Sequence, residues 1–411
     1  MEIKKWTGLH NTGTPESMEP GQMEAAYDVD IDADFKVRTR LGQTQISAVA
    51  SHSIWANDEG DFCVVMQGPD MKRMDESGNL TQLKRLSSSA PVSYAELNHV
   101  IYFSNGTDTG RIVEGTVREW GIRNPIGQPG AAPTYGGLPP GRYLYAMTFL
   151  RLDEKESGSL APQVIELTDS GGISFTAMEV STDPHVVSKC LYLSAPNGTE
   201  LYRIAVVPNA DTSYSYMNAG LDLGIPLGNE FAEPAPAGTI VEIYAGVAYV
   251  IKDGVAWASD IYDLEQFSKS SRFIPMPDQI TMFAAVEDGI FVGNTKDTWF
   301  FEGTDVTNFK ARRVLNEAAV PGTVTKFDAA EEMAGKELPV PSRTALAWMS
   351  SDGVVFAQAS GHVRKVTMAK YSIPMGTVGA GLLRAQRGYV SYVVSQRGMS
   401  PNPTRYQNNV V

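Results

Sequence analysis

The chain has 411 residues, with 34 Lys and Arg against 47 Asp and Glu, and a net charge of −13 at pH 7. This length exceeds the size at which one hydrophobic core stops growing, so we expect two or more cores. The acidic balance argues against a general nucleic-acid clamp, because such surfaces neutralise phosphates with Lys and Arg, although an acidic wall that lets DNA slide past stays compatible with it.

The composition is typical of a turn-rich all-β protein. The chain has 38 Gly and 24 Pro, and 43% of its residues are hydrophobic, an ordinary share for a globular protein. No apolar run approaches the roughly 18 residues that span a bilayer, so we expect no membrane contact. The N-terminus lacks the apolar segment of a secretory signal, which predicts synthesis and folding in a cytoplasm.

Residues 1–44 are predicted to form an N-terminal arm that ends in a first hairpin. Aspartates alternate there from Asp28 to Asp34, as at the start of a calcium loop. Counting from Asp28, an EF-hand needs Gly at the sixth position and Glu at the twelfth, but this chain has Ala33 and Thr39. We therefore predict acidic residues on the solvent face of a strand and no metal site.

A repeated hairpin plan organises most of the remaining chain. Its clearest copy is AGVAYVIKDGVAWASD at 245–260, where Asp253-Gly254 supplies the positive φ of a tight turn between two apolar runs. Looser copies begin near positions 51, 95, 284, 344 and 382. Such repetition predicts an all-β fold, a β-propeller of about six blades. Its first part is 45–121 and its second part is 239–398.

A different pattern separates the two propeller parts. Residues 122–141 and 217–238 are rich in Gly and Pro and are predicted to be linkers. Between them, residues 142–216 carry strand-like runs with no helix, which predicts an inserted β-sandwich. The pairs Leu191-Tyr192 and Leu201-Tyr202 resemble strands of fibronectin type III-like modules. The expected strands are Tyr143–Leu150, Val164–Leu167, Ile173–Ala177, Lys189–Ser194 and Leu201–Val207.

Three further segments lie in or after the second propeller part. Asp328–Gly335 (DAAEEMAG) is predicted to form one or two helical turns within a loop. The glycine-rich run Gly376–Gly381 lacks a following helix, so we interpret it as a flexible loop rather than a dinucleotide-binding motif. The polar tail 399–411 is expected to be disordered alone or to pair with a neighbour.

No catalytic, cofactor-binding or metal-binding residues are predicted. Cys63 and Cys190 lie far apart in apolar runs and are interpreted as two buried, reduced thiols. No P-loop, nucleophile elbow or zinc-type spacing of Cys and His occurs in the sequence. The five histidines are His10, His52, His99, His185 and His362.

Carboxylates are plentiful, but most of them fall where turns are expected. A glycosidase needs two suitably spaced carboxylates, and the candidates are Asp253, Asp260, Asp288 and Asp352. We interpret these aspartates as turn residues. Ser350-Ser351-Asp352-Gly353 begins a sialidase Asp-box without its Thr-Trp ending. The sequence therefore predicts a protein that is not an enzyme and needs no cofactor.

The order of these features resembles a class of phage and prophage virion proteins, the nozzle or tail tubular protein B-like β-propellers of short-tailed phages. The resemblance covers most of the chain as an ordering of elements. The segments that carry it are Ala25-Ala26-Tyr27-Asp28-Val29-Asp30-Ile31, Arg38-x-Arg40-x-Gly42, the run Tyr102–Gly106, Trp120-Gly121-Ile122 with Pro125, Gly141-x-Tyr143-x-Tyr145 with Thr148, and Glu156-Ser157.

The resemblance implies a structural role in a virion tail. It implies a homo-oligomeric ring, a hexamer in that family, which continues the DNA channel below the portal and adaptor, contacts adjacent tail proteins and lets DNA pass without sequence-specific binding. The alternatives are a carbohydrate- or receptor-binding propeller on a virion or cell surface, and a glycan-cleaving propeller.

Overall fold

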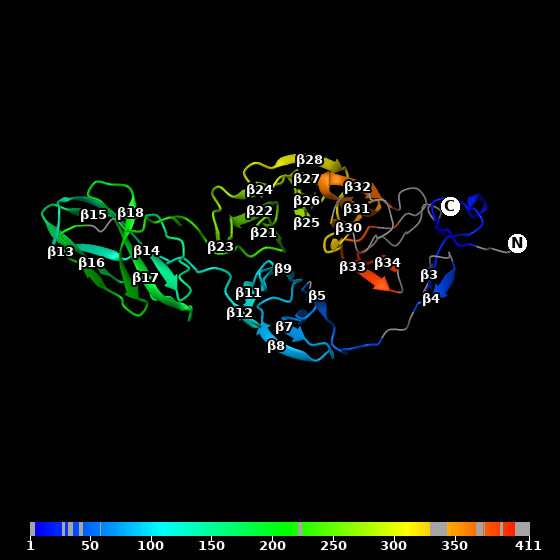
Figure 1. Cartoon of the computed structure of the whole chain (residues 1–411), viewed down its shortest axis with the longest axis horizontal. Coiled ribbons are helices and arrows are strands. Elements are labelled where there is room, and N and C mark those ends of the chain that lie inside the picture. Colours follow the sequence, from blue (N-terminus) through cyan, green and yellow to red (C-terminus); the bar gives the residue numbers. More distant parts are fainter. Residues whose placement is uncertain are drawn as a thin grey trace. The chain divides into compact units, whose positions relative to one another are not determined.

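The computed structural model describes residues 5–26, 29–31, 36–40, 44–57, 59–220, 224–328, 343–366, 373, 375–386 and 389–398. These residues form strands and two short 3-10 helices, η1 (Pro15–Ser17) and η2 (Ala359–Gly361), neither of which is long and apolar enough to cross a membrane (Figure 1). The chain divides into two compact units. Unit 1 comprises residues 1–82, 251–256 and 274–411, and unit 2 comprises residues 83–250 and 257–273.

The all-β propeller fold with an inserted sandwich is confirmed. Among the described residues, five sheets are meanders in which four consecutive strands lie side by side, as in propeller blades. In the first propeller part these strands are β5 (His52–Ala56), β6 (Cys63–Gln67), β7 (Asp70–Met74) and β8 (Leu80–Arg85), then β9 (Ser93–Leu97), β10 (Val100–Ser104), β11 (Thr109–Val113) and β12 (Thr116–Arg118).

The second propeller part supplies three more such sheets. The predicted turn at Asp253 is confirmed: this residue has a φ of 56° and lies between the second and third strands of the first of these sheets. The strands are β20 (Ile240–Tyr244), β21 (Val247–Lys252), β22 (Val255–Asp260) and β23 (Asp263–Phe267), with β24 (Phe273–Pro275) beside β22; β25 (Ile280–Val286), β26 (Gly289–Asn294), β27 (Thr298–Glu302) and β28 (Lys310–Leu315); and β29 (Thr325–Asp328), β30 (Thr344–Ser350), β31 (Gly353–Gln358) and β32 (His362–Lys365).

The sixth repeat differs from the other five. Within the described residues it is a two-stranded sheet of β33 (Val378–Gln386) and β34 (Tyr389–Arg397). The prediction of a flexible loop at Gly376–Gly381 is therefore wrong from Val378 onward. Glycine is needed here for close approach, because a Cβ on Gly381 would lie 2.2 Å from the Thr323 carbonyl oxygen.

Several predicted segments lie wholly or partly outside the described residues. The helical run after Asp328 and the tail 399–411 are among them. In the N-terminal arm, β3 (Val29–Ile31) and β4 (Val37–Thr39) pair antiparallel, as expected for the first hairpin. The arm also contains β1 (Gly8–Leu9) and β2 (Gln22–Met23), which pair in parallel.

The inserted domain is a fibronectin type III-like sandwich of two sheets. One sheet has the order β13-β16-β19 and the other β15-β14-β17-β18. Apolar side chains between them, such as Tyr143, Phe149 and Leu191, are fully buried. The strands are β13 (Gly130–Leu138), β14 (Gly141–Arg151), β15 (Gln163–Leu167), β16 (Gly171–Thr176), β17 (Val186–Ser194), β18 (Leu201–Pro208) and β19 (Tyr214–Tyr216).

Both predicted linkers contribute to this domain. Strand β13 lies inside 122–141 and contains Pro133, which is tolerated because β13 is the edge strand of its sheet. The second linker runs beside β18, where the Leu227 N–H donates to the Leu201 carbonyl oxygen at 2.9 Å. Leu227 packs with Cys190 and Tyr192 on the outer face of the larger sheet.

Two blades share one turn motif, Asn-x-x-Asp, between their second and third strands. The Asn105 Oδ1 accepts the Thr107 and Asp108 N–H groups at 3.0 and 2.6 Å. The Asn294 Oδ1 does the same for Lys296 and Asp297, at 2.7 and 2.8 Å. Both asparagines are buried, at 3% and 0% exposed. The repeat is therefore conserved in hydrogen bonding as well as in strand order.

In the first of these turns, Asp108 ties the preceding loop to the blade. Its carboxylate accepts the N–H groups of Ser87 and Ser88 at 3.1 and 3.2 Å, and the Asn105 amide at 3.2 Å. Burial works against this charge, but hydrogen bonds from Ser87, Asn105 and Ser88 outweigh it and hold the pKa of Asp108 below its ordinary value of 3.8.

This lowered pKa predicts an acid dependence of stability. The contribution of Asp108 is fully present above pH 3.8, the unfolded pKa, and is lost as the pH falls through the lower, folded pKa. We expect Asp108→Asn to lower the free energy of unfolding at pH 7 and to flatten its decline below pH 3.8, measured by urea unfolding across pH. Glu114→Gln, at an exposed carboxylate of the same sheet, is the control, and an equal acid slope in both variants would contradict the prediction.

Candidate functional site

A buried polar site in unit 2 joins the sandwich to two blades. We call it the ionic junction and define it by three cations and three carboxylates: Arg111 on β11, Arg151 at the end of β14, Lys155 and Asp153 in the segment that follows β14, and Asp263 and Glu265 on β23. These residues come from segments far apart in the sequence, so the fold alone assembles the site.

Glu265 lies at the centre of the ionic junction and is shared by two arginines. Its Oε1 is 2.5 Å from the Arg111 Nη1, and its Oε2 is 2.8 Å from the Arg151 Nη1. The Arg151 Nη2 also donates to Oε1 at 3.0 Å, which completes a bidentate pair. The side chains of Arg111, Arg151 and Glu265 are only 9%, 6% and 10% exposed, so these charges depend on one another for solvation.

A second carboxylate holds Arg151 from the other side. The Asp153 oxygens accept the Arg151 Nε and Nη2 at 2.7 and 2.8 Å. Burial works against the charge on Arg151, but hydrogen bonds to Asp153 and Glu265 outweigh it and raise the pKa of the guanidinium. Burial lowers the pKa of Arg111, and the negative charge of Glu265 offsets this lowering only in part. The two cations are thus held in fixed positions by shared carboxylates.

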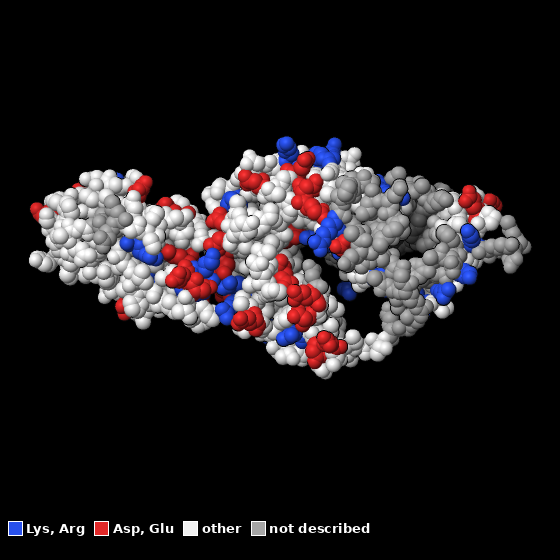
Figure 2. Space-filling model, in the orientation of Figure 1, with Lys and Arg blue, Asp and Glu red and all other residues white. Residues whose placement is uncertain are grey.

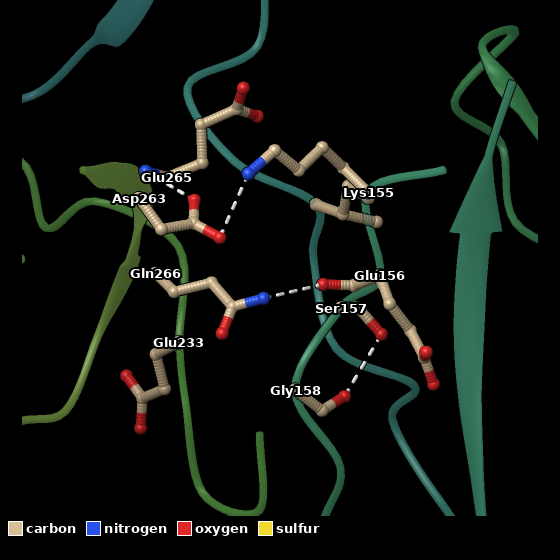
Figure 3. Close-up of a pocket in the computed structure, with 9 residues that line it drawn as sticks. Lys155, Glu156, Ser157, Gly158, Glu233, Asp263, Glu265 and Gln266 are labelled. Carbon is tan, nitrogen blue, oxygen red and sulfur yellow. Dashed lines mark hydrogen bonds and ion pairs between the residues drawn. The ribbon is translucent and has the colours of Figure 1, made fainter. Parts of the chain in front are cut away.

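Beside these charges lies a small cavity, drawn in Figure 3. The Lys155 Nζ is 3.0 Å from an Asp263 carboxylate oxygen, and the Gln266 amide donates to the Glu156 carbonyl oxygen at 2.9 Å. The cavity measures about 10 Å³, which is at most the space of one water molecule. The polar groups around it bond to one another across the junction, so the arrangement suits a structural contact rather than a substrate pocket.

An aromatic cluster lies next to the ionic junction, at the residue that precedes Glu265. The Trp120 indole is 1% exposed and donates to the Leu264 carbonyl oxygen at 2.6 Å. Its ring centroid is 5.0 Å from that of Tyr102 and 5.9 Å from that of Phe267. Burial, together with the charge of Glu265, raises the pKa of Tyr102 to about 12, so this phenol stays neutral. The cluster adds buried apolar area to this contact, which the ionic pairs alone do not provide.

Close backbone approach fixes the returning chain in the same place. A Cβ on Gly158 would lie 1.8 Å from the Ala232 carbonyl oxygen, so only glycine fits there. The Asn229 amide donates to the Ser157 carbonyl oxygen, and Glu233 and Phe267 exchange backbone hydrogen bonds at 3.0 and 2.8 Å. The second connection, 217–238, is therefore tied to the segment between β14 and β15 and to β23.

The cysteines are free thiols in separate strands. Cys190 is buried on β17, where burial raises its thiol pKa to about 11. Cys63 on β6 is only half-buried, so the prediction of full burial is wrong for it, and burial raises its pKa as well. Neither environment favours the thiolate that a nucleophile or a metal ligand requires.

The five histidines also lie apart. His52 Nε2 is 3.1 Å from the Gly68 carbonyl oxygen, and His99 has a φ of 62° in the β9–β10 turn. Across the part of the chain that the structure describes, no group of three or more His, Cys, Asp or Glu side chains is placed to hold a metal ion. The remaining histidines are His10 in the N-terminal arm, His185 before β17, and His362 at the start of β32.

Of the four candidate aspartates, three lie in turns and one does not. Asp253, Asp288 and Asp352 each occupy the connection between two strands of a blade. Asp288 also accepts the Ser360 N–H at 2.8 and 2.9 Å, which links its turn to η2. Asp260 instead ends β22 and is 3.5 Å from the Arg272 Nε, and burial raises the pKa of its carboxyl group.

The residues of the ionic junction were not among those that sequence reasoning selected. Arg111 and Glu265 are charged residues inside otherwise strand-like blade segments, TGRIV and DLEQF. A charge in such a position predicts a partner, since an unpaired charge is rarely buried. The sequence carries that signal without saying which residues pair.

Comparisons with known proteins establish no family for the chain. Neither the known protein-family signatures nor the curated protein sequences match it. Among solved structures, it is similar to a streptogramin B lyase, with 11% identity, 84% of this chain and 93% of that chain covered, and a TM-score of 0.34. It is also similar to BBS1N in complex with ARL6DN (10%, 85% and 94%, 0.31) and to Saccharomyces cerevisiae Sqt1 (12%, 80% and 86%, 0.25). At these identities and TM-scores the likenesses carry no argument about function.

Proposed function

We propose that this protein is a structural component of a phage virion tail, nozzle-like, and that its copies form a ring that continues the DNA channel below the portal and adaptor. The observation that carries the proposal is the ionic junction, a buried polar site whose groups bind one another around a cavity of about 10 Å³. Such a site holds an inserted domain in one orientation, as an assembly subunit needs.

The order of sequence features supports the same role. A propeller interrupted by a small β-domain, with the segments at Tyr102–Gly106 and Gly141–Thr148, is similar to the nozzle-like class. The net charge of −13 suits a wall along which DNA passes without sequence-specific binding. In this role the chain is made in the bacterial host cytoplasm, is incorporated into the virion tail and contacts adjacent tail and adaptor proteins.

Electron microscopy tests the proposal. Negative-stain images of the purified protein are expected to show closed rings, a hexamer by family resemblance. A tagged copy in virions is expected to give density on the tail axis. Monomers that bind a glycan array would overturn the proposal in favour of a carbohydrate-binding propeller. Turnover of a sugar substrate that one Asp→Asn change abolishes would instead identify a glycosidase.

A further inference from the structure

Strand β28 carries an exposed run of cations at the edge of its blade. The four consecutive residues Lys310 to Arg313, sequence KARR, are all exposed. A strand with one face on a core shows alternating burial, so exposure of four consecutive residues means that neither face of this stretch is fully covered, although it pairs with β27 along its length. Figure 2 shows Lys and Arg side chains gathered where Figure 1 draws β28.

Two of the cations of β28 contact groups of their own blade and of the following one. The Arg312 guanidinium lies 5.5 Å from the centre of the Phe300 ring and donates to the Ser360 carbonyl oxygen. The Arg313 Nη1 is 3.8 Å from Asp297, whose side chain is only 17% exposed, and Lys310 lies opposite Glu302. Asp297 lies mostly beneath the surface, so the exposed strip carries three cations beside one exposed carboxylate, Glu302.

The same chain offers a complementary surface on the sheet β5–β8. The β5–β6 and β7–β8 turns lie side by side at one end of this sheet, because Cys63 at the start of β6 pairs with Met74 at the end of β7. Four exposed carboxylates lie on these turns, with Arg73 as the one described cation beside them, stacked on Phe62. The carboxylates are Glu59, Asp61, Asp75 and Glu76.

We propose that the basic strip of β28 in one copy contacts the acidic turns of the β5–β8 sheet in a second copy. The inference rests on the proposed ring and names its contact. The two surfaces are different parts of one chain, so the contact is head-to-tail, the kind that generates rings. Cations on an edge strand oppose strand addition, so side chains make the contact rather than a shared β-ladder. Charge complementarity of this kind sets partner choice and orientation.

A second copy fits the strip better than nucleic acid does. Strand β28 contains no aromatic residue on which a base could stack, and the chain as a whole is acidic. The acidic turns, by contrast, are opposite in charge to the strip and are exposed as it is. Nucleic-acid binding by β28 is therefore an outcome that the test must be able to detect.

The test uses the full chain and sedimentation velocity at low and high salt. Lys310→Glu/Arg313→Glu is expected to weaken assembly by roughly tenfold in dissociation constant, and so is the reciprocal Glu59→Lys/Glu76→Lys. Combining the two pairs is expected to restore assembly. The control Arg142→Glu/Lys252→Glu changes the net charge as the β28 pair does, at exposed positions elsewhere, and circular dichroism verifies the fold of every variant.

Each other outcome overturns the inference in a distinct way. Rings that form normally in the β28 variant overturn this contact and leave the proposed function intact. A wild-type chain that stays monomeric at all salts, with no density on the tail axis of virions, overturns both. Binding of a double-stranded DNA oligonucleotide that the β28 variant loses would assign the strip to nucleic acid instead.

Discussion

Replacing Glu265 by alanine is expected to lower the free energy of unfolding of unit 2 by about 3–5 kcal/mol, the usual cost of breaking a buried ion pair from one side. The change leaves Arg111 and Arg151, which are 9% and 6% exposed, without their shared carboxylate. Asp153 still holds one side of Arg151, whereas Arg111 loses its closest charged partner. The measurement is urea unfolding, with hydrogen exchange of peptides from β14 and β23 to assign the transition to unit 2.

Two companion variants show whether the charge is responsible. Glu154→Gln, at an exposed position of the segment that follows β14, is expected to change stability by less than about 0.5 kcal/mol. The triple change Arg111→Met/Arg151→Met/Glu265→Leu removes all three charges and is expected to cost less than Glu265→Ala alone. If Glu265→Ala costs no more than Glu154→Gln, the ionic junction does not hold the sandwich in place.

The local part of the fold could be predicted from the sequence. The 245–260 hairpin is specified by its own turn, since Asp253 takes the positive φ that an Asp-Gly turn requires. Repetition of such units is sufficient to predict blades, because each copy shows the same alternation of apolar runs and turns. The half-buried position of Cys63 was missed, since an apolar strand does not reveal how fully its ends are covered.

Prediction failed where tertiary contact overrides composition. Strand β13 contains Pro133 and three glycines, and it lies at a sheet edge beside β16, where proline is tolerated. The run from Val378 to Gly381 looks like a loop by composition, yet its glycines serve close packing against residues 321–323. The ionic junction depends on pairings between distant segments, which no single stretch of sequence specifies.

The second large effect is expected at Trp120, which lies where the chain leaves the β9–β12 blade for the sandwich. Trp120→Ala removes a fully buried indole that packs on Tyr102 and Phe267, and we expect it to cost about 3–5 kcal/mol. The loss combines a cavity between blade and connection with an unpaired Leu264 carbonyl oxygen, the acceptor of the indole N–H at 2.6 Å. Urea unfolding, with hydrogen exchange of β23 peptides, measures it.

Trp120→Phe separates these two contributions. Phenylalanine keeps most of the ring contacts but has no N–H, so we expect a smaller loss of about 1–3 kcal/mol, the cost of one unsatisfied buried acceptor. Because Leu264 directly precedes Glu265, the Trp120→Phe and Glu265→Ala effects are expected to be non-additive in a double-mutant cycle. Additive effects would mean that the aromatic cluster and the ionic junction hold the sandwich independently of each other. A Trp120→Ala cost below about 1 kcal/mol would mean that the aromatic cluster does not hold it at all.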